Sequence, residues 1–306
     1  MKNDLNKAYK DLRKMLEKGI VSKDYDLRNH NTYFISCIAK VVVNVNSLET
    51  FMKTILYCKD NDIKPVILAR GSNVILASAR LNRLVIIFGE KFNNIFNLGS
   101  YVICESGATI SEIINYCRNV NLSGMEEAIG IPGSIGGAVY MNAQAFGYET
   151  SKVLSSVLVY RDGKICEIDA RDLNFGYRYS SFMDSNDIIL RVELSLSEDS
   201  RENIADRIKT TALKRASAQK IAYPNAGSVF KNGNNYFAGE MIDKCGLKNY
   251  NIGKAYVSNF HANFIENRGG ATGEDIIELI HYIQEVVLDR YNIKLELEQR
   301  IIGDEK

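Results

Sequence analysis

Residues 130–147 read GIPGSIGGAVYMNAQAFG, and this stretch says more about the fold than any other part of the chain. Five of its 18 residues are glycine, at positions 130, 133, 136, 137 and 147. Glycine lets the backbone approach a ligand closely and adopt positive φ. Consecutive N–H groups in such a loop form a concave anion site, which suits a diphosphate. A tight structural turn is the alternative, but one glycine would be enough for it.

The order of the glycines argues against the two common nucleotide-binding loops. A Rossmann fingerprint needs G-x-G-x-x-G directly after a strand, and a Walker A loop needs Lys followed by Ser or Thr after its last glycine. Neither pattern occurs in this stretch. The glycine run therefore points to a different kind of nucleotide site.

Composition bounds the class of protein. The chain has 306 residues, enough for two or three domains, with 46% hydrophobic and 25% charged residues. Its formal net charge is +1, so no overall field attracts nucleic acid or an anionic membrane. Neither is expected as a partner, and an anionic substrate must be held by local groups.

The N-terminal residues and the cysteines indicate a cytoplasmic protein. Residues 1–20 have apolar side chains at helical spacing among charges, which predicts an amphipathic helix and no signal peptide. No apolar run is long enough to span a membrane. The six cysteines lack C-x-x-C spacing and stand in apolar surroundings, as buried thiols do in a reducing compartment. The three histidines offer no zinc-binding pattern, so no metal is expected.

The pattern of strands and helices divides the chain into four segments. Residues 1–29 are the leading helix and its connection, and residues 30–90 alternate strand, helix and strand as a first lobe. Residues 91–200 form a strand-rich second lobe with one helix at 109–120. Residues 201–306 open with a charged helix and are predicted to form the C-terminal domain.

A helix that begins after Thr272 has the clearest local signals. Thr272 and Asp275 have the spacing of a capping box. The helix is predicted to bury one apolar stripe in the core, formed by Ile276, Ile277, Ile280, Ile283, Val287 and Leu288.

The glycine stretch resembles a known flavin-binding segment. Residues 130–143 are similar to the second FAD-contacting segment of the UDP-N-acetylenolpyruvoylglucosamine reductase (MurB) family, G-I-P-G-[ST]-x-G-G-A-x-x-M-N-A. The resemblance extends over about residues 28–303 and is to the shorter, type II form. It implies an α+β fold: a two-lobed FAD-binding domain, as in the PCMH or vanillyl-alcohol-oxidase type, followed by a smaller α+β substrate-binding domain.

The resemblance also implies which residues contact FAD. They come from the first FAD loop, from one glycine further along, and from the glycine stretch. The predicted cofactor-binding residues are Arg70, Gly71, Ser72, Asn73, Gly107, Ile131, Pro132, Gly133, Ser134, Gly136, Gly137, Ala138 and Asn142.

Three further strings carry candidate catalytic groups: Arg178 in FGYRYSSF, Ser228 in AGSVFKN and Glu298 in KLELEQRIIG. Taken alone, each has an ordinary structural explanation: a stacked guanidinium, a turn before a strand, or an edge strand with paired glutamates. The family resemblance implies instead that the arginine contacts the substrate carboxylate, that the serine gives a proton to C2 of the enolpyruvyl group, and that the glutamate is catalytic. Arginine suits its role because its planar fork binds a carboxylate in two places.

The implied reaction is the FAD-dependent reduction of UDP-N-acetylglucosamine enolpyruvate to UDP-N-acetylmuramate, with NADPH as hydride donor, in peptidoglycan precursor synthesis. Arg178 and Glu298 would stabilise the negative charge that develops, and Ser228 would protonate C2. Tyr177, Lys231 and Asn232 are predicted to hold the substrate. The enzyme is expected to be a monomer.

The resemblance is weakest at six positions where the family has, or can have, glycine: 36, 37, 69, 70, 144 and 148. A side chain at such a position threatens a clash with the cofactor or a strained backbone. The alternative is therefore a UDP-sugar-binding or regulatory protein of the same family with impaired flavin binding. A different flavin oxidase on the same fold would need another substrate lobe, against which the AGSVFK and RIIG strings argue.

Overall fold

The computed structural model describes residues 4–220 and 222–304. This part of the chain divides into two compact units, and each is described by itself. Unit 1 contains the residues up to 21, then 43–70 and 85–218; unit 2 contains 22–42, 71–84 and the residues from 219 onward. Helices and strands occur in both, as predicted for an α+β protein.

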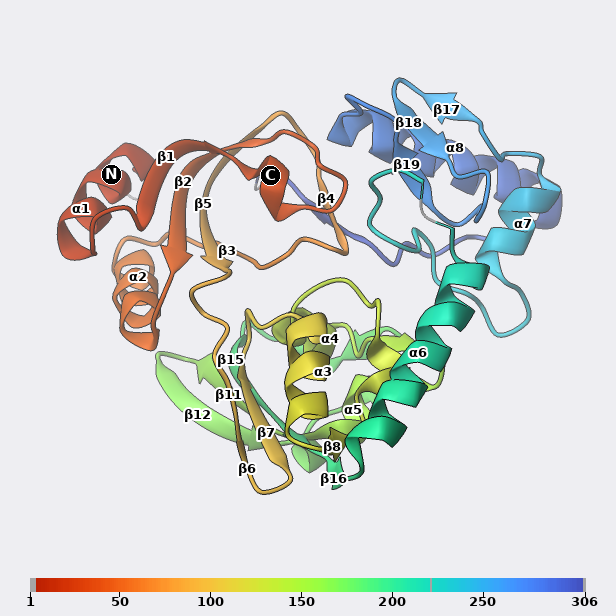
Figure 1. Ribbon diagram of the computed structural model, residues 1–306. Helices are drawn as coiled ribbons and strands as arrows, with labels where there is room; N and C mark the ends of the chain where they lie inside the picture. Colours follow the sequence, from red (N-terminus) through yellow and green to blue (C-terminus); the bar gives the residue numbers. More distant parts are fainter. Residues whose placement is uncertain (1–3, 221, 305–306) are drawn as a thin grey trace. The chain divides into compact units, whose positions relative to one another are not determined.

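Unit 1 holds most of the helices and the largest sheet (Figure 1). Its helices are α1 (Leu5–Met15), α2 (Leu48–Asp60), α3 (Ile110–Asn119), α4 (Ile135–Tyr140), α5 (Thr150–Val153) and α6 (Arg201–Ala218). Its strands are β3 (Val66–Leu68), β6 (Ile95–Leu98), β7 (Tyr101–Glu105), β8 (Leu122–Ser123), β9 (Gln144–Ala145), β10 (Tyr148–Glu149), β11 (Leu154–Arg161), β12 (Lys164–Asp169), β13 (Phe175–Gly176), β14 (Tyr179–Ser180), β15 (Ile188–Ser195) and β16 (Ser197–Glu198).

Local capping explains where the predicted helices of unit 1 begin. The Ser47 hydroxyl accepts a hydrogen bond from the Thr50 N–H at the start of α2, as expected. Thr109 and Glu112 form a complete capping box at the start of α3. Each cap satisfies backbone donors that a helix start would otherwise leave without partners.

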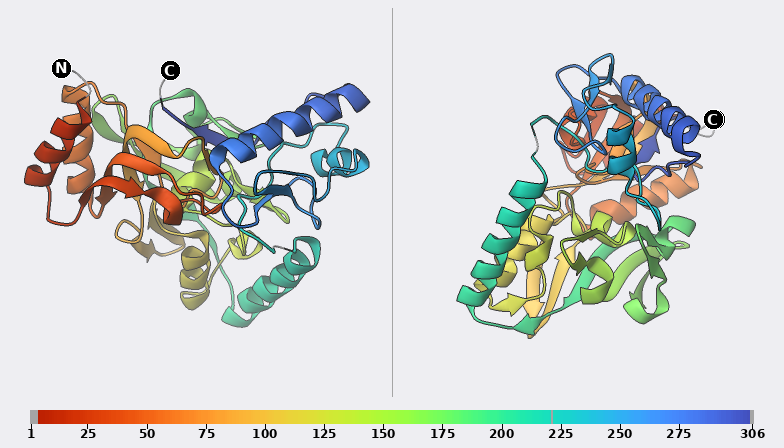
Figure 2. Two further views of the ribbon diagram at one scale, coloured as in Figure 1. Left: turned by 90° about the horizontal axis from the view of Figure 1, so that it is seen from above. Right: turned by 90° about the vertical axis from the view of Figure 1, so that its right-hand side faces the viewer.

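The core of unit 1 is built on a five-stranded antiparallel sheet with the order β12-β11-β15-β7-β6. Alternate residues of these strands, such as Val157 and Val192, are fully buried. They belong to the same apolar cluster as Ile113 of α3 and Val139 of α4, so these two helices cover one face of the sheet. Helix α6 runs beside α3 (Figure 2).

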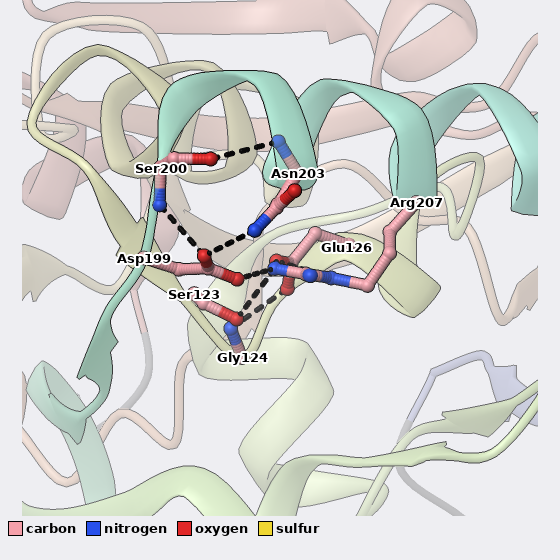
Figure 3. Close-up of polar contacts among 7 residues, drawn as sticks. All are labelled: Ser123, Gly124, Glu126, Asp199, Ser200, Asn203 and Arg207. Atoms are coloured by element: carbon pink, nitrogen blue, oxygen red, sulfur yellow. Dashed lines mark hydrogen bonds and ion pairs between the residues drawn. The ribbon is translucent and has the colours of Figure 1, made fainter.

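A polar cluster attaches α6 to the rest of unit 1 (Figure 3). The Arg207 guanidinium donates to Glu126 Oε1 through Nε at 3.1 Å and Nη2 at 2.7 Å, and to Asp199 Oδ2 at 2.6 Å. Burial raises the pKa of the Glu126 carboxyl, but hydrogen bonds from Arg207 and the Gly124 N–H lower it more, so the pKa lies below its ordinary value. The carboxylate therefore stays charged although its side chain is almost completely buried.

Unit 2 consists mainly of the C-terminal third of the chain. Its own elements are β1 (Val21–Asp26, whose first residue is counted with unit 1), a 3-10 helix η1 (Leu27–His30), β4 (Val74–Leu76), α7 (Ala238–Lys244), β17 (Asn251–Ile252), β18 (Ala255–Val257), β19 (Ile265–Asn267), α8 (Gly273–Tyr291) and β20 (Arg300–Ile302). Strands β17, β18 and β19 form an antiparallel sheet, and α8 packs against it (Figure 1). Strand β20 pairs in parallel with β4.

Helix α8 confirms the predicted capping box. Thr272 Oγ1 accepts from the Asp275 N–H at 3.1 Å, and Asp275 Oδ2 accepts from the Thr272 N–H at 3.0 Å. The predicted apolar stripe needs one correction: Leu288 is 42% exposed, whereas Leu279 is completely buried. Fully burying one such aliphatic side chain stabilises a fold by about 1.5–3 kcal/mol, so the stripe anchors unit 2.

One four-stranded sheet, with the order β1-β2-β5-β3, contains strands with residues counted in both units. The strands concerned are β2 (Ile38–Val45), β5 (Arg80–Phe88) and, by its first residue alone, β1. By its contacts α6 belongs to unit 1, whereas the sequence-based division begins the C-terminal domain at 201; that division stays a prediction.

None of the helices in the described part of the chain has the length and apolar character needed to cross a bilayer. The six cysteines are unpaired thiols, of which Cys166 and Cys245 are half-buried and the other four are buried. Across residues 4–220 and 222–304, no three His, Cys, Asp or Glu side chains are placed to hold a metal ion.

Candidate functional site

Residues 130–134 of the glycine stretch form a loop that leads into α4. The Ser134 hydroxyl caps this helix by accepting from the Gly137 N–H at 3.3 Å. The N–H groups of Ile131, Ile135 and Gly136 are used within the protein, by the carbonyls of Ala128, Ala108 and Ser106. None of the described hydrogen bonds uses the N–H of Gly133 or Ser134, and Gly133 has φ +118°. These two donors are the part of the loop that could face an anion.

Several of the predicted cofactor glycines are required by the protein's own packing. A Cβ at Gly107 would overlap the Phe92 carbonyl oxygen, and one at Gly136 would lie 2.7 Å from the Ser106 Cβ. In unit 2, a Cβ at Gly71 would overlap the His30 carbonyl oxygen. Gly137, by contrast, is exposed and has room for a side chain. The close approach that glycine permits is therefore made to a backbone carbonyl at Gly107 and Gly71, and to the Ser106 side chain at Gly136.

The remaining predicted cofactor residues differ in burial. Arg70 and Pro132 are exposed, Ser72, Asn73 and Ile131 are half-buried, and Ala138 is buried.

Arg215 of α6 lies against the glycine loop and was not singled out in the sequence. A Cβ on Gly130 would come within 2.7 Å of the Arg215 Cδ, and the guanidinium carbon lies 5.6 Å from the centre of the Phe146 ring. The Arg215 Nη1 is buried without a hydrogen-bond partner. Burial lowers the pKa of this guanidinium, although arginine remains charged. A charge with an unused donor beside this loop fits an anionic group.

Arg178 stands at the tip of the β13–β14 hairpin of unit 1. The pairs Phe175–Ser180 and Gly176–Tyr179 leave Tyr177 and Arg178 as the whole turn. Arg178 has φ +54°, a conformation that favours glycine or asparagine. Its Nη1 donates to the Gln144 carbonyl at 3.2 Å, and its guanidinium lies over the Tyr177 ring, 5.2 Å from the ring centre. The turn thus presents the two predicted substrate-contacting side chains together.

Asn142, a predicted cofactor residue, has its side chain inside the protein. It is fully buried, and its Nδ2 donates to Glu149 Oε1 at 3.0 Å and to the Gly176 carbonyl at 2.9 Å. Its Oδ1 accepts from the Ser151 N–H at 3.1 Å. The hydrogen bond from Asn142 is the main reason that the pKa of Glu149 lies below its ordinary value. Both donors of the amide are therefore committed to protein acceptors.

Ser228 and Glu298 lie on neighbouring segments of unit 2. The Glu298 N–H donates to the Val229 carbonyl at 2.8 Å, and Phe230 pairs with Leu297 in antiparallel fashion. Ser228 therefore lies one residue beyond the pair formed by Val229 and Glu298. Both Ser228 and Glu298 are half-buried. The structure thus brings two of the three predicted catalytic residues onto adjacent backbone segments.

Asn73 and Gln299 hold these two segments in place. Asn73 Nδ2 donates to the Glu298 carbonyl at 3.2 Å, and the Asn73 carbonyl accepts from the Arg300 N–H at 2.9 Å. The buried Gln299 amide donates to the Ala226 carbonyl at 3.1 Å, directly before the Gly227–Ser228 step. The Gln299 Oε1 accepts from the hydroxyl of Tyr33 at 2.9 Å. Gln299 was not predicted from the sequence, since only its spatial neighbours reveal this role.

The two predicted substrate residues of unit 2 follow Ser228 along the chain. Lys231 Nζ pairs with Glu296 Oε1 at 2.6 Å, and the Lys231 N–H donates to the Glu296 carbonyl at 2.8 Å. Asn232 is exposed, and its Oδ1 accepts from the Ala238 N–H at the start of α7. Lys231 is thus a cation held beside a carboxylate.

The six positions where a glycine is replaced are free of the strain that the sequence suggested. None of them is among the described non-glycine residues with positive φ. Tyr148 is buried in the apolar cluster of unit 1, and its hydroxyl contacts Met125 Sδ at 3.6 Å. Ser36 donates from its hydroxyl to Asp26 Oδ2 at 2.8 Å. The backbone argument for impaired flavin binding therefore fails at these positions.

Comparison with known proteins connects these features to a family. Residues 219–302 match the family described as "UDP-N-acetylenolpyruvoylglucosamine reductase, C-terminal domain", and residues 39–169 match "FAD binding domain". UDP-N-acetylenolpyruvoylglucosamine reductase of Clostridium novyi is 35% identical over 99% of this chain and 97% of that protein. The protein of the same name from Pediococcus pentosaceus is 38% identical over 88% of this chain and 89% of that protein.

Solved structures give the same picture. The crystal structure of UDP-N-acetylenolpyruvylglucosamine reductase (MurB) from Thermus caldophilus is 30% identical, with a TM-score of 0.77 over 90% of this chain and 97% of that one. Alkyldihydroxyacetonephosphate synthase, at 11% identity and a TM-score of 0.50, shares the fold alone over 63% of this chain. The predicted α+β architecture, an FAD-binding domain followed by a smaller C-terminal domain, is confirmed. The chain belongs to the UDP-N-acetylenolpyruvoylglucosamine reductase (MurB) family.

Proposed function

We propose that this protein is the FAD-dependent enzyme that reduces UDP-N-acetylglucosamine enolpyruvate to UDP-N-acetylmuramate in the cytoplasm, with NADPH as hydride donor. The observation that carries the proposal is the retention of Ser228 and Glu298 on adjacent hydrogen-bonded segments of the matched C-terminal domain. A protein that only bound the UDP-sugar would have no use for a proton donor and a catalytic carboxyl on paired segments. Arg178, half-buried at a hairpin turn, supplies the cation that the reaction needs.

The residues present fit FAD as the cofactor. The unused N–H groups of Gly133 and Ser134 and the unpartnered Nη1 of Arg215 are donors suited to a diphosphate. The match of residues 39–169 to an FAD-binding domain supports the same cofactor. When bound and reduced, FAD supplies the hydride that the enolpyruvyl group receives.

The chain's own groups would handle charge and protons. The Arg178 fork binds the substrate carboxylate in two places and stabilises the negative charge that develops beside it. Ser228 Oγ gives its proton to C2, and the Glu298 carboxyl stabilises the developing enolate when it carries a proton. Lys231 binds a substrate oxygen anion in exchange for Glu296.

A two-step flavin assay tests the proposal. The purified protein, loaded with FAD, is expected to be yellow, to lose its visible absorbance when NADPH is added without air, and to regain it when UDP-N-acetylglucosamine enolpyruvate follows. UDP-N-acetylglucosamine, which lacks the enolpyruvyl group, is the control and should restore nothing. If the protein binds the UDP-sugar but takes up no flavin, the proposed enzyme function is wrong and the alternative, a UDP-sugar-binding protein, is supported.

A further inference from the structure

The β13–β14 hairpin that carries Arg178 is too short to hold its own shape. It has two paired residues on each side of a two-residue turn, and an isolated hairpin of this kind is unstable in water. Its turn also places Arg178 at φ +54°, a strained conformation that persists only where the surroundings impose it. Something outside the hairpin must therefore fix the arginine.

Three side-chain-to-backbone bonds connect this hairpin to residues 140–144 of the glycine stretch. Asn142 Nδ2 donates to the carbonyl of Gly176, directly before the turn, at 2.9 Å. On the other strand, Ser180 Oγ donates to the Tyr140 carbonyl at 2.6 Å. Arg178 itself donates to the Gln144 carbonyl. All three bonds end within residues 140–144, so one short segment sets the position of the turn.

Asn142 is the member of this group that is most completely fixed. It is fully buried, has φ +43°, and uses both amide hydrogens and its carbonyl oxygen within unit 1. The ionised Glu149 accepts its second hydrogen, which orients the amide so that Nδ2 faces the Gly176 carbonyl. An amide is needed here because a carboxylate would place an acceptor against this carbonyl.

We infer that Asn142 is a positioning residue for Arg178: it acts on the substrate through the hairpin and does not act as a ligand of the cofactor. The inference rests on the proposed function for the role of Arg178. It explains why the glycine stretch contains an asparagine, Asn142, although both hydrogens of its side-chain amide are used within the protein and none is left for a ligand.

The test compares the half-reactions of Asn142→Ala with those of the FAD-loaded wild type. FAD affinity, measured by quenching of flavin fluorescence, and the rate of reduction by NADPH are expected to stay within twofold. Reoxidation by UDP-N-acetylglucosamine enolpyruvate should slow at least tenfold. Loss of FAD affinity as large as the loss of reoxidation rate would assign Asn142 to the cofactor and overturn the inference.

A double variant separates positioning from a general structural effect. If Asn142 acts through Arg178, then Asn142→Ala/Arg178→Ala should be no slower in reoxidation than Arg178→Ala alone. If the double variant is slower by the product of the two single-variant factors, the two residues act independently and the inference is contradicted. Asn203→Ala is the matched control, since it removes a comparable amide bond, to Asp199 at 2.9 Å, elsewhere in unit 1. It should leave both half-reactions unchanged.

Hydrogen exchange gives a readout that needs no activity. Residues 175–180 should exchange faster in Asn142→Ala than in the wild type, while the β11–β15 core keeps its protection. Unchanged exchange would overturn the inference even if activity falls. If Asn142→Ala fails to fold, Ser180→Ala can be used, since it removes the hydrogen bond from Ser180 Oγ to the Tyr140 carbonyl. It is expected to change reoxidation and exchange in the same direction but by less. If the substrate cannot reoxidise the reduced flavin of the wild type, the proposed function is wrong. The hydrogen-exchange result then still shows whether Asn142 holds the hairpin in place.

Discussion

Ser228 follows Gly227, whose φ of +75° turns the chain just before the pairing with residues 296–298 begins. Replacing Ser228 by Ala removes one hydroxyl and leaves this backbone in place. We expect reduction of the flavin by NADPH to proceed as in the wild type, and reoxidation by the substrate to slow about 10²–10⁴-fold, the usual contribution of a positioned proton donor. Stopped-flow absorbance of the flavin measures both steps. The exposed Ser217→Ala is the control, and two unchanged rates would exclude Ser228 as the donor.

The ion pair between Lys231 and Glu296 makes a second prediction at this scale. Glu296 is 69% exposed and lies on Lys231 Nζ at 2.6 Å. If Lys231 binds a substrate anion as proposed, that anion has to replace Glu296. Exposed pairs are worth about 0.2–1 kcal/mol. Glu296→Gln should therefore bind UDP-N-acetylglucosamine about 1.4-fold to fivefold more tightly in a calorimetric titration. Glu240→Gln, which breaks the similar pair with Lys244, should change nothing. Weaker binding by Glu296→Gln would contradict this prediction and show that Glu296 contributes favourably to binding of the UDP-sugar.

Candidate site residues could be chosen from short strings in the sequence, but the residues that contact them in the fold could not be predicted. The predicted cofactor glycines could be interpreted as ligand contacts, yet Gly107 is required by close contact with the Phe92 carbonyl and Gly136 by close contact with Ser106. Asn142 looked like part of the same site, whereas its amide is used by Gly176 and Glu149. Close approach and hydrogen bonding are spatial relations, and a linear pattern does not contain them.

At the scale of single elements, α8 depends on its capping box. Thr272→Ala removes the hydroxyl that accepts from the Asp275 N–H. Loss of such a cap costs about 1 kcal/mol, and urea unfolding followed by circular dichroism should show the free energy of unfolding reduced by about this amount. Thr272→Ser keeps the hydroxyl and should retain most of the stability. Equal losses in the two variants would mean that the methyl group, and not the cap, is what matters.

Helix α6 should respond to acid through Glu126. The pKa of this carboxyl lies below its ordinary value of 4.5 in the folded protein. The charged form is therefore favoured by folding, so its contribution is complete above about pH 4.5 and is lost as the pH falls through the folded pKa. The free energy of unfolding should fall more steeply below this pH in the wild type than in Glu126→Gln. Parallel curves would contradict the prediction, and Glu198→Gln on the neighbouring strand β16 is the control.

Elements were predicted better than their orientation. The helices that begin after Ser47 and Thr272 were predicted because capping and periodicity are local signals. The buried stripe of α8 was wrong at Leu288 and incomplete at Leu279. A helix has several possible faces near a 3.6-residue period, and the sheet formed by β17–β19 decides which of them is covered.

The whole molecule should be stabilised by its cofactor. A ligand that binds only the folded state adds about 2.7 kcal/mol at 100 times its Kd, which raises Tm by roughly 5 °C for a large domain. We expect thermal unfolding of the apoprotein to shift by this amount when FAD is added. Riboflavin, which lacks the diphosphate, should have a much smaller effect. An equal shift with riboflavin would contradict the assignment of the glycine loop and Arg215 to the diphosphate.

The division into two units, as the structure shows it, could not be predicted from the sequence. Each unit is assembled from separated stretches, and residues 22–42 and 71–84 join the C-terminal third. Composition and periodicity mark no boundary at these points. Only long-range pairing, such as that of β20 with β4, shows where these stretches belong.

That pairing also has a consequence for biosynthesis. While the ribosome extends the chain, β4 emerges early and must wait for β20, whose translation comes more than two hundred residues later. Until then Asn73 has neither the Glu298 carbonyl nor the Arg300 amide to bind. Sequence-distant contacts of this kind form slowly and leave strand edges open meanwhile. The nascent protein can therefore build the five-stranded sheet well before the segment that carries Glu298 is fixed in place.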